Sequence, residues 1–201
     1  MTSDGIPRKK ARPSALNSLW ARRNTWEALT LAALFGAVLG VLAPSHAAEG
    51  VLLAFLAGAT LFDLRTGLIP NALTLAATLF ALVAWLTAPS LGITPMVSGL
   101  SAALSLWVLR IGSAHWLGTP GFGMGDVKLA FPLGIVLGWS ALWALYLAVV
   151  LAAMVAVPGL LSRRLARRSQ IPFAPFMLGG VLLSYALPLG RVLDWIALLM
   201  L

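Results

Sequence analysis

The sequence contains no cysteine and very little negative charge. Of its 201 residues, only six are Asp or Glu, and charged residues of both signs make up 10%. The absence of cysteine excludes disulfides, thiolate metal ligands and cysteine nucleophiles. A soluble domain has about 25% charged residues, whereas this chain is 60% hydrophobic and has a mean hydropathy of +0.95. These proportions predict a polytopic membrane protein.

The 14 Lys and Arg residues give a formal charge of +8 and occur in short clusters between apolar runs. They are not interleaved with aromatic residues on a soluble module, so we expect no nucleic-acid partner. The tendency of positive charge to stay on the cytoplasmic side explains the clusters. Residues 1–25 carry six of these basic residues. They predict a basic cytoplasmic tail that is attracted to anionic lipid.

The apolar runs predict an all-α membrane protein with about seven transmembrane helices, in a range of about six to eight, since a span needs about 20 residues. One helical domain would cover 26–190, with a cytoplasmic N-terminus and an external interfacial tail at 191–201. Thirteen of the 14 Lys and Arg residues then lie on the cytoplasmic side. The runs are 26–43, 49–62, 71–88, 95–113, a short helix from Asp126, 140–161 after a break at Gly138-Trp139, and 173–188.

The first apolar run has a second interpretation. A basic region, an apolar run and small residues before Ala47 are also typical of a cleaved signal peptide. Gly36 and Gly40 form a small-xxx-small face, which favours a retained, packed helix. Both interpretations leave the topology after Ala47 unchanged.

Two aspartates stand at the ends of apolar runs. Asp63 follows the run 49–62, and Asp126 follows the glycine-rich loop 117–125. The predicted topology places both at the inner membrane surface. In an aspartyl protease, one ionised carboxyl takes a proton from water while its protonated partner polarises the scissile carbonyl. That reaction needs no metal and no other cofactor, and the two histidines are too far apart in the sequence to suggest a metal site.

Helix ends give a hypothesis for the two roles. Asp126 lies at a helix N-terminus, where the dipole favours an anion, and Asp63 lies near a helix C-terminus, where it favours the neutral acid. Asp126 would then be the resting base and Asp63 the resting acid. The alternative is structural: each carboxylate pairs with a nearby cation, Arg65 or Lys128, at a loop end.

The residues next to each aspartate have backbone explanations. Gly123 and Gly125 would permit positive φ and the close approach of a substrate strand, unless they belong to an ordinary flexible loop. Pro70 suits the start of a helix, and Asn71 is a plausible N-cap. Lys128 would face away from Asp126 on a helix, with interfacial snorkelling as its simplest role.

These residues resemble a known family. Asp63 with Ile69-Pro70-Asn71, and the segment Gly123-Met124-Gly125-Asp126-Val127-Lys128, resemble the two motifs of the type IV prepilin peptidases, which are GxGD membrane aspartyl proteases. The segment 171–176 resembles their proline-rich motif before the last helix, so the likeness covers about 60–180.

The resemblance implies an activity and a partner. Asp63 and Asp126 would be the catalytic pair of a peptidase domain over 26–190, with Gly123, Gly125, Lys128, Pro70 and Asn71 in the loops at the substrate. The enzyme would remove the basic leader from prepilins or pseudopilins at the cytoplasmic face of the bacterial inner membrane. Its partners would be the apolar helix of the substrate and the lipid bilayer. The resemblance implies no particular oligomeric state.

Longer members of that family also methylate the new N-terminus, using a cytoplasmic domain with paired cysteines. This sequence has no cysteine and resembles the short, peptidase-only type found with Tad/Flp pilus systems. We therefore expect no N-methyltransferase activity.

Three other functions fit less well. A presenilin-like intramembrane protease would have its partner aspartate after tyrosine within a helix, whereas Asp63 follows Phe62 at the end of a run. A small transporter would show inverted repeats or broken helices, and neither pattern is present. A non-catalytic assembly scaffold would tolerate mutation of Asp126.

Overall fold

A computed structural model of the chain describes residues 47–118, 120–161 and 172–187. These residues form six α-helices and one short 3-10 helix, with no strand among them. The predicted tails 1–25 and 191–201 and the apolar run 26–43 lie outside the described residues. The helices are α2 (Ala47–Thr66), α3 (Asn71–Leu86), η2 (Pro89–Leu91), α4 (Thr94–Leu117), α5 (Met124–Leu137), α6 (Ser140–Leu161) and α7 (Ala174–Ala186).

The all-helical prediction is confirmed, and so is the break at Gly138. This glycine has φ 61° at the C-terminal end of α5, a conformation that glycine adopts without steric cost. Two helices are longer than the apolar runs indicated, because α2 continues past Asp63 to Thr66 and α4 continues to Leu117. Hydropathy marks where the apolar side chains end, whereas the backbone hydrogen bonds of a helix can continue into the polar residues that follow.

Within the described parts of the chain, three helices are long and apolar enough to cross a membrane: Ala47–Thr66, Thr94–Trp116 and Ser140–Pro158. The helices Asn71–Leu86 and Ala174–Ala186 are apolar but shorter. Large apolar side chains are exposed at helical spacing on α3 and α4, which is typical of faces that meet lipid. Those side chains are Leu75, Leu79 and Val83 on α3, and Leu100, Leu104, Val108 and Ile111 on α4.

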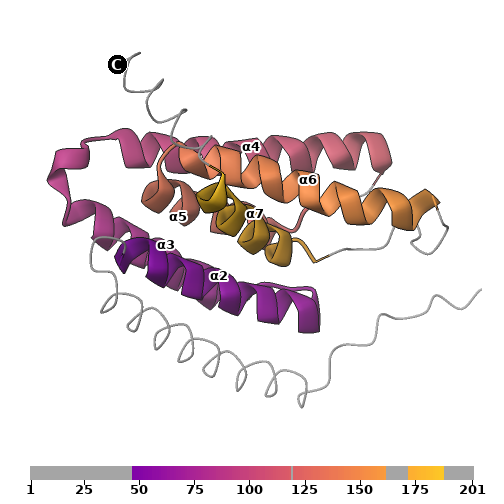
Figure 1. Ribbon diagram of the computed structural model, residues 1–201, viewed down its shortest axis with the longest axis horizontal. Coiled ribbons are helices and arrows are strands. Elements are labelled where there is room, and N and C mark those ends of the chain that lie inside the picture. The colour runs from indigo at the N-terminus through magenta and orange to yellow at the C-terminus, as the bar shows by residue number, and fades with distance from the viewer. Residues whose placement is uncertain (1–46, 119, 162–171, 188–201) are drawn as a thin grey trace, which may run out of the picture.

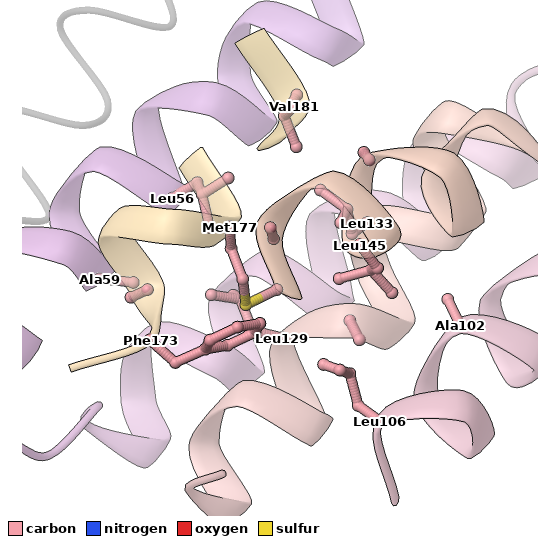
Figure 2. Close-up of a cluster of buried hydrophobic side chains, with 14 of the residues drawn as sticks. Leu56, Ala59, Ala102, Leu106, Leu129, Leu133, Leu145, Phe173, Met177 and Val181 are labelled. Carbon is pink, nitrogen blue, oxygen red and sulfur yellow. The ribbon is translucent and has the colours of Figure 1, made fainter. Parts of the chain in front are cut away.

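Helix α5 lies at the centre of the bundle. It packs against α2, α3, α4 and α6, while α7 packs against α2 and α6. In Figure 1, α5 and α7 lie between α2 and the long helices α4 and α6. Figure 2 shows Leu129 of α5 beside Met177 of α7 and beside Phe173, which precedes α7, with Ala59 of α2 nearby. Because α5 is buried on nearly every side, its first turn has a fixed position among these helices.

A close crossing fixes α5 against α4. A Cβ on Gly134 would lie 2.6 Å from the Cα of Gly99, so only glycine allows the two backbones to approach this closely. The buried Ser98 hydroxyl donates to the carbonyl of Gly134 over 2.8 Å. Together these contacts fix the height of α5, and therefore of Asp126, along α4.

Candidate active site

The structure brings the two aspartates together. Asp63 lies in the last turn of α2 and is 7% exposed, and Asp126 lies in the first turn of α5 and is 4% exposed. The two carboxyls are close enough for their charges to interact. Since buried acidic residues are rare unless they are paired or functional, this juxtaposition defines the candidate site.

Asp63 is supported by the beginning of α7. Its Oδ2 accepts the backbone N–H of Ala174 over 2.9 Å, and the backbone of Phe173 also donates to this carboxyl. The first N–H groups of a helix have no partner within the helix. Asp63, from a distant part of the chain, therefore provides the hydrogen-bond acceptor for the first backbone N–H groups of α7.

Asp126 is supported by its own loop. Its Oδ2 accepts the backbone N–H of Gly123 over 2.9 Å. Its Oδ1 is buried and has no hydrogen-bond partner among the described residues. Such an oxygen is a ready acceptor for a water, a substrate amide or a shared proton.

The hypothesis about resting roles loses its basis. It placed Asp63 at the C-terminus of one helix and Asp126 at the N-terminus of another. The structure places Asp63 also at the N-terminus of α7, whose first N–H groups it accepts. Both carboxyls thus lie in the favourable field of a helix N-terminus, so helix dipoles do not separate the acid from the base.

The motif glycines serve close packing rather than positive φ. Gly123 has φ −70°, and neither it nor Gly125 is among the glycines with positive φ, so that prediction is wrong. A Cβ on Gly125 would lie 2.9 Å from the Cβ of Ile69, and a Cβ on Gly123 would lie 3.0 Å from Oδ2 of Asp126. The absence of a side chain at Gly125 therefore lets the motif around Asp126 pack directly against Ile69 of the other motif.

The prediction that Asn71 caps α3 is also wrong. Pro70 is the N-cap residue and no side chain caps the helix, while Asn71 is the first helical residue. Its Oδ1 instead accepts a hydrogen bond from Nζ of Lys128 over 2.9 Å at the surface. Lys128 therefore joins the two motifs, and its amino group is directed at α3.

Sequence reasoning missed three residues at the site. Arg110 of α4 donates to the carbonyl of Phe122, and its positive charge interacts with Asp126. The ring of Phe122 packs edge-on against Phe173, with centroids 4.7 Å apart. A charged residue inside the apolar run 95–113 was the available signal for Arg110. No local pattern indicated the aromatic pair.

The fold and the site define a class: a helical membrane protein with an aspartate pair buried at the junction of α2, α5 and α7. Within the described ranges, no three His, Cys, Asp or Glu side chains are grouped to hold a metal ion. The sequence profile of the type IV leader peptidase family, peptidase family A24, matches residues 50–160. The chain belongs to this family.

Curated relatives agree with this assignment. The prepilin leader peptidase/N-methyltransferase of Pectobacterium carotovorum subsp. carotovorum is 35% identical over 136 residues, covering 65% of this chain and 48% of the relative. Proteins of the same name from Burkholderia pseudomallei (strain K96243) and Aeromonas hydrophila are 32% and 33% identical, covering 76% and 85% of this chain and 50% and 56% of the relatives. The chain thus spans about half the length of these relatives. No solved structure matches it.

Proposed function

We propose that this chain is a membrane aspartyl endopeptidase that removes the basic leader from prepilins or pseudopilins. The observation that carries the proposal is the pair of buried, interacting carboxyls, Asp63 and Asp126, within the region that matches the peptidase family. Its relatives are named prepilin leader peptidases, which supports the substrate class.

The proposed chemistry uses one water and one shared proton. The ionised carboxyl of the pair takes a proton from water, and the hydroxyl adds to the scissile carbonyl carbon. The protonated carboxyl gives its proton to the carbonyl oxygen, which forms a gem-diol. Collapse breaks the C–N bond, the leaving nitrogen receives a proton from the first carboxyl, and the second is reprotonated by the collapsing diol.

The proposed topology has a cytoplasmic N-terminus, about seven spans and the active site at the cytoplasmic face of the inner membrane. The basic segments and the apolar helices support it. A basic leader and a basic inner face repel each other at long range. Recognition therefore depends on the apolar helix of the substrate, which packs beside the outward faces of these helices within the bilayer.

The test is leader removal from a co-expressed prepilin, followed by the mobility shift on a gel. Asp63→Asn and Asp126→Asn keep size and remove the ionisable group, so each lowers the cleavage rate by at least about 100-fold. Glu49→Gln is the matched control, because it makes the same chemical change at the other end of α2. Cleavage that continues in either aspartate variant, at normal membrane levels, refutes the paired mechanism and reopens the transporter and scaffold functions.

A further inference from the structure

Arg110 contacts the loop that leads into α5 and Asp126. It lies in α4, seven residues before the end of that helix, and its side chain is half-buried. Its guanidinium donates to the carbonyl oxygen of Phe122, and its charge interacts with Asp126. A partly buried arginine in an apolar helix is costly unless it is paired or functional.

The two hydrogen bonds around Asp126 share one peptide group. The carbonyl of Phe122 and the N–H of Gly123 belong to the same peptide unit; the oxygen accepts from Arg110 and the N–H donates to Oδ2 of Asp126. Hydrogen bonds in such a chain polarise one another. Arg110 therefore both orients this peptide and strengthens the N–H that holds the carboxyl.

The next turn of α4 holds the same loop. The hydroxyl of Ser113 accepts the N–H of Gly121 over 2.8 Å and donates to the carbonyl of Arg110 over 2.9 Å. Three consecutive loop residues, 121–123, are thus tied to α4 or to Asp126. The loop has a defined path, and Arg110 is the charged member of the set that defines it.

The charges around Asp126 come from few elements. Helix α2 contributes Asp63 and α4 contributes Arg110, while Lys128 on α5 itself is bonded to Asn71. The described residues of α3, α6 and α7 contain no Asp, Glu, His, Lys or Arg. Among the described residues, Arg110 is therefore the cation whose charge acts on Asp126.

We propose that Arg110 is a positioning residue for Asp126: it fixes the Phe122–Gly123 peptide and supplies the positive charge that lets the carboxyl pair carry one negative charge in a buried site. This inference rests on the proposed peptidase function. Arg110 thus has two roles, the hydrogen bond to Phe122 and the positive charge near Asp126, and different substitutions remove each of them.

Three variants of Arg110 separate the two parts, with purified enzyme in detergent and a prepilin substrate. Arg110→Met removes both, and kcat falls about 100-fold through misplacement of Asp126, with KM within about threefold. Arg110→Gln keeps a donor for Phe122 and loses less kcat. In both, the pH–rate profile moves to higher pH, because loss of a cation disfavours ionisation of a nearby carboxyl. Arg110→Lys keeps the charge, so it lowers kcat without moving the profile.

His115→Gln is the matched control on the same helix, because His115 is exposed near the end of α4. It leaves kcat and the pH profile unchanged. An unchanged kcat in Arg110→Met, or equal losses in all three variants with no shift of the profile, overturns the proposal in favour of an ordinary structural arginine. If Arg110→Met does not accumulate in the membrane, the comparison of Gln with Lys decides.

A stability measurement keeps this inference separate from the peptidase function. The melting temperatures of Arg110→Met, Asp126→Asn and the double variant form a cycle that needs no substrate. We expect the double variant to be less destabilised than the sum of the singles, because each single change breaks the same set of contacts. Additive shifts overturn the proposal. If the unmodified enzyme cleaves no prepilin, the proposed function fails, while the cycle still tests the link between Arg110 and Asp126.

Discussion

The two aspartates reach the same site by different routes. Asp126 is held by Gly123, three residues before it in the chain. Asp63 is held by Ala174, 111 residues after it. The hydrogen bond to Asp126 forms within a short sequence motif, whereas the hydrogen bond to Asp63 forms only when α2 and α7 have packed together.

The proline-rich entry to α7 explains why Asp63 is needed there. Proline has no N–H, and Pro175 occupies the first turn of α7 just after Ala174. Orphan N–H groups at the helix N-terminus are therefore concentrated on Phe173 and Ala174, and both donate to Asp63. Pro175 thus leaves the remaining backbone donors of the helix entry directed at one carboxyl.

The largest effect is expected for a substitution in the glycine motif before Asp126. It tests whether this motif also sets the distance between Asp126 and Asp63. In Gly125→Ala the new Cβ meets the Cβ of Ile69 at 2.9 Å, so the start of α5 must move away from the turn that follows α2. A displacement of about 1 Å costs on the order of 100-fold in rate. We expect that loss in kcat for leader cleavage.

Two further variants control this prediction. Gly112→Ala places a methyl group where nothing lies within 4 Å, and it leaves the rate unchanged. Combining Gly125→Ala with Ile69→Gly removes the colliding atom and restores part of the rate. A fully active Gly125→Ala enzyme would show that the contact between the motifs does not set the geometry of the pair.

A medium effect is expected where the two environments meet. Phe122 precedes Gly123, and Phe173 precedes Ala174, and their rings are in edge-on contact with 82° between the planes. Phe122→Leu and Phe173→Leu should each lower the free energy of unfolding by at most about 1.5 kcal/mol. Their double-mutant cycle should give a coupling of about 0.5–1.5 kcal/mol, measured by denaturation in detergent. Additive losses would mean that the two supports are independent.

Much of the fold could be predicted from the sequence, because a bilayer demands apolar helices and the breaks between them are marked by proline, glycine or charge. The division at Gly138 is an example. Helix ends were less predictable, since α2 continues through Asp63 to Thr66. Hydropathy indicates the environment of the side chains, but it does not indicate the residue at which the backbone hydrogen bonds of a helix end.

The candidate site was predictable in its aspartates and less so in their partners. Asp63 and Asp126 are charges beside apolar runs, and that signal needs no structure. The support from Phe173 and Ala174 comes from backbone groups, which carry no residue signature. Asn71 has a side chain typical of a cap, but its partner is Lys128, because tertiary contact outweighs a weak local preference.

The smallest expected effect concerns the link between the motifs at the surface. Lys128 and Asn71 are both exposed, so water replaces either side of their hydrogen bond at little cost. Lys128→Met and Asn71→Ala should each change the free energy of unfolding by less than about 1 kcal/mol, and the cleavage rate by less than about threefold. If Lys128→Met instead abolishes cleavage while its melting temperature stays the same, the amino group contacts the substrate rather than α3. Lys128 would then be a third charged side chain, besides the two aspartates, that acts directly in the reaction. It would lie on α5, the helix of Asp126.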